Sequence, residues 1–352
     1  MTFSRIITRL AGSALLVLAG ILLLNLVLGL LFTLWNRNKN HLGGTYTDAP
    51  YVYYQKKEAG GTGFDIPATI SLQKDSPEYR ILLLGGSVAH ALGNLTDSAG
   101  RNLLEGLLQT YLPGRQVVLL NGALPAFVSA QELIALQLHL RNYQPDLVVA
   151  LHGFNDTESF RVNHPADDPH FIPSPLFYAG DEFSPALRAV EEYKKTYTLR
   201  GVWEGATRYI RKTLHFIGRA AGLSRYPYEQ YETVTTQTLD RYGRAYVRVV
   251  KDLQQFCAAN GMQYADFLQP VRFYRPGDST YHRSGAADQG PELLARLYYR
   301  LEQGSAAMPG HQSLTGLDPA QLGFTDACHP DDRGYRWLAT QLAAALKSQL
   351  QE

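Results

Sequence analysis

The sequence predicts an α/β domain in which a parallel β-sheet carries helices on both faces. Short apolar runs alternate with segments of helical length, and each run ends abruptly in small or polar residues. The first run, Ile81–Leu84, is followed at once by Gly85, Gly86 and Ser87. A continuous apolar run bounded by glycine is typical of a strand buried on both faces. Because functional groups of such sheets gather at the carboxyl ends of the strands, we expect Ser87 to lie at a functional edge.

Strand and helix patterns alternate along the rest of the domain, which favours parallel pairing. After the strand ending at Leu84, the expected elements are a helix near 102–111, a strand over 116–120, a helix over about 129–142, a strand over 147–151, helices over about 185–221 and 229–260, a strand over 263–268, a short strand before Asp326 and a helix over about 331–350. We expect Asp331 or Asp332 to cap this last helix.

Composition excludes several classes of protein. The 352 residues include 33 Lys and Arg against 32 Asp and Glu, a net charge of +1, so no overall bias toward nucleic acid is expected. Cys257 and Cys328 are the only cysteines, and no Cys/His spacing typical of zinc occurs. Two unpaired thiols, no metal and no organic cofactor are therefore expected.

The amino-terminal segment predicts a membrane anchor. Leu10–Leu34 is almost wholly apolar, and 25 helical residues span about 37 Å, more than a hydrocarbon core of about 30 Å. The apolar part of a cleaved signal peptide covers only about 7–15 residues and precedes a small-residue site, which is missing after Leu34. We expect residues 1–40 to anchor the chain in a bacterial cytoplasmic membrane, with the domain on the periplasmic or extracellular side. Residues 41–79, rich in Gly and Tyr, are expected to form an irregular stalk before the domain at 80–352.

Four segments of polar or small residues fall at the expected strand ends or before the last helix. A serine hydroxyl becomes a useful nucleophile when a base takes its proton and donors stabilise the oxyanion. His329 and Asp326 lie three residues apart, so one loop can supply the base and the acid that orients it. Backbone N–H groups and an asparagine amide can supply the donors. The four segments are Gly85-Gly86-Ser87, residues 121–126, residues 153–156 and residues 326–330.

Together these segments resemble the SGNH or GDSL-type hydrolases, over about residues 80–346. The four blocks of that family match as GGS at Ser87, NGALPAF at Ala126, GFND at Asn155 and DACH at His329. The resemblance implies a flavodoxin-like three-layer αβα fold, with Ser87 as nucleophile, His329 as base and Asp326 as its orienting acid. It also implies an oxyanion hole made by the Ser87 N–H, the Ala126 N–H and the Asn155 side chain.

The chain departs from the family pattern at two positions. Gly86 replaces an aspartate that is common there, although a GGS subgroup exists. Ala126 stands where a glycine usually donates its N–H, and an alanine serves equally well if the turn does not demand a positive φ. If it does, Gly122 is the alternative donor. An α/β-hydrolase is set aside, because the second glycine of its G-x-S-x-G elbow would fall at Ala89.

Other polar residues receive structural interpretations. His90 and His152 are expected to be packed or solvent-facing imidazoles, and Asp156 is expected to stabilise its own turn. Cys328 is expected to be a small buried apolar residue. An insert at about 157–231, rich in aromatic and basic residues, is expected to form a helical cap. A lid over the substrate and a lipid-facing surface remain as alternatives for this insert.

The functional hypothesis is a serine esterase that removes O-acyl groups, with acetyl expected, from a cell-envelope glycan or related ester through an acyl-Ser87 intermediate. One alternative is an O-acetyltransferase that uses the same residues on an exported polysaccharide. Another is a catalytically idle fold that serves an envelope complex as a binding module. The expected partners are the acylated substrate and the membrane, with no nucleic acid; the acyl chain, oligomeric state and protein partners are not predicted.

Overall fold

A computed structural model describes residues 3–36, 46–49, 53–56, 63–163, 234–282 and 292–351 of the chain, with a few single residues between 207 and 217. The chain divides into two units: residues 1–44 with 181–230, and residues 45–180 with 231–352. Most of the expected insert, including the helix expected over 185–221, lies outside the described residues.

The first unit contains one long helix, α1 (Phe3–Asn36), whose side chains are described at Ser13 and over residues 16–31. Its Asn25 side chain accepts a hydrogen bond from the backbone N–H of Tyr209 at 2.8 Å. Over the described part of the chain, none of the helices is long and apolar enough to cross a membrane.

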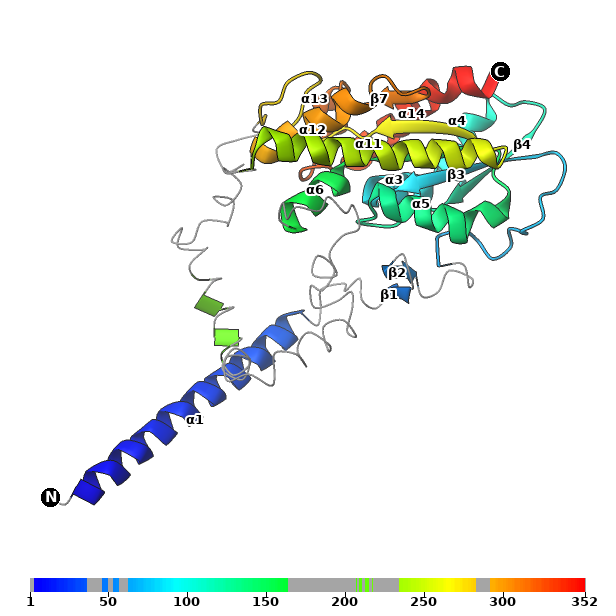
Figure 1. The fold of residues 1–352 in the computed structure, drawn as a ribbon. Helices are drawn as coiled ribbons and strands as arrows, with labels where there is room; N and C mark the ends of the chain where they lie inside the picture. Colours follow the sequence, from blue (N-terminus) through cyan, green and yellow to red (C-terminus); the bar gives the residue numbers. More distant parts are fainter. Residues whose placement is uncertain are drawn as a thin grey trace. The chain divides into compact units, whose positions relative to one another are not determined.

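The second unit is built on a five-stranded parallel sheet (Figure 1). Its strands lie in the order β4-β3-β5-β6-β7, which places the first strand of the domain between the second and the third. This order is the one found in flavodoxin-like folds. The strands are β3 (Glu78–Gly85), β4 (Gln116–Asn121), β5 (Leu147–His152), β6 (Gln263–Leu268) and β7 (His311–Ser313).

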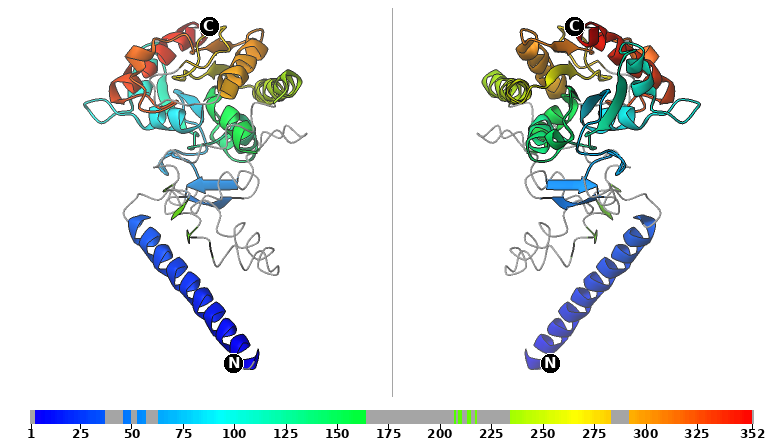
Figure 2. Two further views of the ribbon diagram at one scale, coloured as in Figure 1. Left: turned by 90° about the vertical axis from the view of Figure 1, so that its left-hand side faces the viewer. Right: turned by 90° about the vertical axis from the view of Figure 1, so that its right-hand side faces the viewer.

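Helices cover both faces of this sheet, as Figure 2 shows: α13 and α14 lie on one side, and α11 and α12 on the other. The first group also includes α3 and α4, which pack against α14, and the second includes α5 and α6, which pack against α11 and α12. The helices are α3 (Ser87–Asn94), α4 (Leu103–Gln109), α5 (Ser129–Leu138), α6 (Phe154–Asn163), α11 (Thr236–Ala259), α12 (Glu292–Ser305), α13 (Pro319–Leu322) and α14 (Asp332–Gln351).

The parallel α/β architecture is therefore confirmed, while several elements differ from the pattern-based expectation. Helices α3 and α6 were not expected, because each is short. Helix α12 was not expected either, although its buried residues Leu294, Leu297 and Leu301 follow the helical period. Helix α5 ends at Leu138 and gives way to the 3-10 turn η1 (Leu140–Tyr143), which closes at Gln144 in a left-handed conformation with φ 51°. Asp331 does cap α14, since its carboxylate accepts the Gly334 N–H at 2.7 Å.

The segment before the sheet is more ordered than an irregular stalk. It contains the antiparallel pair β1 (Tyr46–Ala49) and β2 (Tyr53–Lys56). Phe64 and Ile66 are buried to 1% and 2% exposure and join the core. The apolar contacts of the lead-in thus extend the packed domain upstream of residue 80.

Candidate active site

Two glycines shape the turn that presents Ser87 at the end of β3. Gly85 has φ 144°, and a Cβ built there would lie 2.3 Å from the Leu151 carbonyl oxygen. A Cβ at Gly86 would lie 2.0 Å from Nδ2 of Asn155. Only glycine therefore lets β3 turn directly into α3, which starts at Ser87. As the first residue of that helix, Ser87 directs its N–H away from the helix, with no intrahelical acceptor.

The structure brings Ser87, His329 and Asp326 together in one hydrogen-bonded row. Ser87 Oγ lies 2.7 Å from His329 Nε2, and His329 Nδ1 lies 2.7 Å from Asp326 Oδ2. An ionised carboxylate only accepts hydrogen bonds, so the imidazole proton sits on Nδ1. The bare Nε2 then accepts the hydroxyl proton of Ser87, which is the arrangement that activates a serine nucleophile.

The loop that carries His329 orients its own aspartate. Asp326 Oδ1 accepts the N–H groups of Cys328 at 2.9 Å and His329 at 2.8 Å, which leaves Oδ2 to hold the imidazole. Partial burial raises the pKa of Asp326, but these hydrogen bonds outweigh it, and the pKa stands below its ordinary value. The carboxylate is therefore ionised at neutral pH and can stabilise a developing imidazolium.

The second block holds an alanine in a conformation that usually requires glycine. Ala126 has φ 64°, so the turn does demand a positive φ. Gly122 nevertheless does not fit the role of alternative donor, because its N–H is already bonded to the carbonyls of Leu83 at 2.9 Å and Leu120 at 3.2 Å. The alanine accepts the strain of the left-handed region, which costs on the order of 1–2 kcal/mol. Gly122 is therefore set aside, and Ala126 remains the expected donor position of this block.

Asn155 joins the serine turn to this second block. Its Nδ2 donates to the Phe127 carbonyl at 2.8 Å and lies against the backbone of Gly86. A carboxamide carries two N–H groups, so the second remains to donate to a ligand. The N–H of Leu124 also donates to the Gly85 carbonyl at 3.1 Å. The three segments expected to form an oxyanion hole are thus linked to one another directly.

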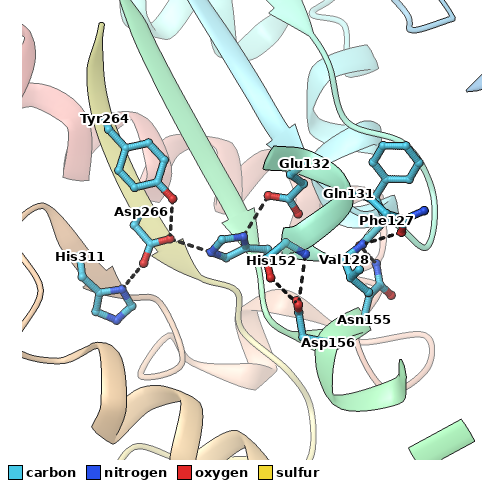
Figure 3. Close-up of polar contacts among 11 residues, drawn as sticks. Phe127, Val128, Gln131, Glu132, His152, Asn155, Asp156, Tyr264, Asp266 and His311 are labelled. Carbon is cyan, nitrogen blue, oxygen red and sulfur yellow. Dashed lines mark hydrogen bonds and ion pairs between the residues drawn. The ribbon is translucent and has the colours of Figure 1, made fainter. Parts of the chain in front are cut away.

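A second cluster of charged groups lies buried beneath these loops (Figure 3). His152 Nδ1 lies 2.9 Å from Glu132 Oε2, and its Nε2 lies 2.6 Å from Asp266 Oδ1. Asp266 also accepts hydrogen bonds from His311 Nδ1 and, at 3.2 Å, from the Tyr264 hydroxyl. The expectation of a packed imidazole at His152 is confirmed, but nothing in the sequence predicted its two carboxylate partners.

Burial and pairing shift the pKa values of this buried cluster in different directions. Burial lowers the pKa of His152, but Glu132 and Asp266 outweigh it and hold that pKa well above 6.5, so the ring is an imidazolium. Burial raises the pKa of Asp266, but His152 and His311 lower it to about 2. Burial raises the pKa of Glu132, and the nearby carboxylates of Asp156 and Asp266 raise it further. Its Oε1 has no hydrogen-bond partner among the described residues.

Asp156 pins the loop of Asn155 to the start of α5. Its Oδ1 accepts hydrogen bonds from the Ser129 N–H at 3.1 Å and the Ser129 hydroxyl at 2.7 Å. Asp156 therefore does more than the expected stabilisation of its own turn, where the Gly153 N–H also acts on its carboxylate, because the Ser129 contacts join two different loops. His152 and Glu132 make a parallel link between the same segments, so the cluster fixes the two loops of the expected oxyanion hole relative to each other.

One group of side chains in the described part of the chain has the composition of a metal site. Asp326, Cys328 and His329 present ligand atoms within 4.8 Å of one another. Cys328 is 2% exposed, as expected for a small apolar residue, and burial holds its thiol pKa well above the ordinary value. Because metals bind the thiolate, and His329 already pairs with Asp326, the group fits proton transfer better than metal binding. Cys257 and Cys328 are both free thiols.

Comparison with known proteins gives a consistent but distant likeness. No protein-family model and no curated protein sequence matches the chain. Among solved structures, it is similar to a GDSL-like lipase from Bacteroides thetaiotaomicron (TM-score 0.38, 10% identity, 79% of this chain and 90% of that one). It is also similar to a psychrotrophic esterase from Pseudoalteromonas (0.39, 14%, 78% and 99%) and to a lipase/acylhydrolase from Enterococcus faecalis (0.36, 15%, 77% and 96%). At 10–15% identity, these likenesses concern the fold alone.

Proposed function

We propose that this chain is a serine esterase of the SGNH type, which transfers an acyl group from an ester to Ser87 and then to water. The 2.7 Å contact between Ser87 Oγ and His329 Nε2 carries the proposal, since it joins a nucleophile to an oriented base. His329 takes the serine proton as Oγ attacks the ester carbonyl, and returns it to the leaving alcohol. Water, activated by the same imidazole, then releases the acid and regenerates Ser87.

The oxyanion of each tetrahedral intermediate is proposed to accept hydrogen bonds from three donors: the N–H of Ser87, the N–H of Ala126 and the second N–H of Asn155. The links between the three loops support this assignment, because donors help most when they are fixed before charge develops. No metal or organic cofactor takes part in the proposed steps.

The proposed substrate is an O-acyl, preferably O-acetyl, group on a glycan of a bacterial cell envelope. This choice rests on a proposed single-pass anchor at residues 1–40, with the catalytic domain outside the cytoplasmic membrane. The apolar sequence Leu10–Leu34 and the exposure of leucines along α1, such as Leu16 at 76% and Leu26 at 70%, support the anchor.

The test is covalent labelling of the full-length chain in detergent with a fluorophosphonate probe, together with turnover of p-nitrophenyl acetate. Wild type is expected to be labelled and active, and Ser87→Ala and His329→Ala to lose both properties. His282→Ala is a matched control, because His282 pairs with Asp278 at 2.9 Å and is 37% exposed, against 36% for His329, but has no contact with Ser87.

The outcome separates the proposal from its alternatives. A folded wild-type chain that is not labelled would favour an idle fold acting as a binding module. Labelling with acyl release that requires a sugar acceptor would instead identify an O-acetyltransferase. Loss of activity in His282→Ala equal to that in His329→Ala would show that the assay reports folding and not the base.

A further inference from the structure

A groove between α11 and α12 is lined by cationic side chains and lies outside the site described above. Arg244, Arg248 and Lys251 face it from α11 and Arg300 faces it from α12, around a volume of about 560 Å³. Asp240 is the one acidic residue in its described lining, and it is paired with Arg300 through Nε and Oδ1 at 2.6 Å. The groove therefore carries a local positive charge, although the whole chain has a net charge of only +1.

The three cations of α11 are exposed. None of them has an ion pair or hydrogen bond with any side chain in the described part of the molecule, whereas Arg300 is held by Asp240. They stand four and three residues apart, so they share one face of the helix. Seven residues of α-helix rise by about 10 Å, so the three charges form a short row and not a single pocket.

Glycines keep the floor of this groove narrow. A Cβ at Gly304 would lie 2.7 Å from Val247 Cγ2, and one at Gly243 would lie 3.0 Å from the Cβ of Arg300. The two helices therefore approach closely at the bottom of the groove, and the long arginine and lysine side chains form its sides. Such a shape accommodates an extended chain along the helix better than a compact ion.

We propose that this groove binds a segment of an acidic polysaccharide, whose carboxylate or phosphate groups pair with Arg244, Arg248 and Lys251. A row of cations is complementary to a linear polymer that carries a charge on successive units, because each unit meets one side chain. The choice of a glycan over other polyanions rests on the proposed function. A polymer held in the groove would present its O-acyl groups repeatedly to Ser87, since tethering raises their effective concentration.

The test compares binding of fluorescent polygalacturonate, neutral dextran and single-stranded DNA to the full-length chain in detergent. All proteins carry Ser87→Ala, so the measurement does not depend on catalysis and its failure is separate from failure of the proposed esterase. The groove variant carries Arg244→Gln, Arg248→Gln and Lys251→Gln. The control variant removes the same charge from three exposed cations elsewhere, Arg115→Gln, Arg141→Gln and Lys347→Gln.

The starting protein is expected to bind polygalacturonate but not dextran, and to bind it less tightly as salt is added. The groove variant should bind it about tenfold or more weakly, and the control variant should stay within about twofold. An equal loss in both variants would reduce the effect to net charge and overturn the proposal. Absence of binding, equal binding of dextran, or tighter binding of the DNA would also overturn it.

Discussion

Two histidine–carboxylate clusters in this molecule have nearly the same bond lengths and opposite surroundings. His329 pairs with Asp326 at 2.7 Å, and the two side chains are 36% and 55% exposed. His152 lies 2.9 Å from Glu132 and 2.6 Å from Asp266, and all three side chains are at most 1% exposed. The first cluster can exchange protons with a substrate and with water, and the second has no access to either.

The difference shows that a short histidine–carboxylate contact does not by itself indicate catalysis. In the buried cluster, two carboxylates hold the His152 pKa well above 6.5, so the ring keeps its proton and cannot act as a base near neutral pH. At His329, one carboxylate holds one nitrogen, and the other nitrogen stays open toward Ser87. Burial and the number of partners therefore assign structure to one cluster and chemistry to the other.

The largest expected effect is on activity at the exposed cluster. His329→Gln is expected to lower kcat by about 10³-fold or more, because no other group takes the serine proton. The free energy of unfolding should change by less than about 0.5 kcal/mol, as for other exposed substitutions. Initial rates with p-nitrophenyl acetate and urea unfolding followed by circular dichroism measure the two quantities. A clear fall in the free energy of unfolding of His329→Gln, beyond about 0.5 kcal/mol, would contradict the comparison.

The next effect is on stability, at the buried cluster. His152→Gln removes the cation that pairs with both Glu132 and Asp266 and leaves Asp266 only its contact with His311, so the free energy of unfolding should fall by about 3–5 kcal/mol. Urea unfolding followed by circular dichroism measures this change. If the unfolding curve of this variant overlaps that of wild type, the cluster does not have the stabilising role assigned here.

A third prediction concerns the contact between Gly86 and Asn155. Gly86→Ala is expected to displace the Asn155 amide and lower kcat by about 10²–10³-fold, the usual effect of losing one oxyanion donor. Asn155→Ala should cause a similar loss by itself. In a double-mutant cycle, Gly86→Ala should add little in the Asn155→Ala background. Fully additive losses would show that the glycine acts through something other than this amide.

Acid titration gives a fourth, smaller effect. The pKa of Asp266 is about 2 in the folded chain, against about 3.9 for an unfolded chain, so the unfolded state takes up the proton first as pH falls. The free energy of unfolding should therefore decrease by about 2 kcal/mol between about pH 4 and pH 2 through this group. Asp266→Asn cannot ionise, and its unfolding free energy should lack that component. If the free energy of unfolding decreases equally in both proteins between about pH 4 and pH 2, the decrease comes from other carboxylates.

The smallest effect is expected at Ala126. The φ of 64° is strained for alanine, so Ala126→Gly should raise the free energy of unfolding by between 0 and about 1 kcal/mol. The backbone N–H is retained in this variant, and so the activity should be retained as well. Ala126→Val should lose both stability and activity, since a β-branched residue tolerates this conformation poorly. If Ala126→Gly clearly destabilises the protein, the contacts of the alanine methyl contribute more to the free energy of unfolding than the relief of backbone strain does.

The local features of the site were predictable because they involve neighbouring residues. Asp326 binds the N–H groups of residues two and three positions later, so D-x-x-H encodes an oriented pair within one loop. The apolar run before Gly85-Gly86-Ser87 likewise indicated a buried strand ending in a tight turn. The strands β3, β4, β5 and β6 and the long helix α11 follow from equally local patterns.

The tertiary structure decided what depends on long-range packing. The strand order of the parallel sheet brings His329 to Ser87 across 242 residues, and places Asp266 beside His152 across 114. The left-handed turn at Ala126 and the cationic groove likewise result from how distant elements pack. The sequence determines local geometry because hydrogen bonds between residues close in the chain depend on those few residues alone. Burial and charge pairing between distant residues exist only once the strands are paired in the folded sheet.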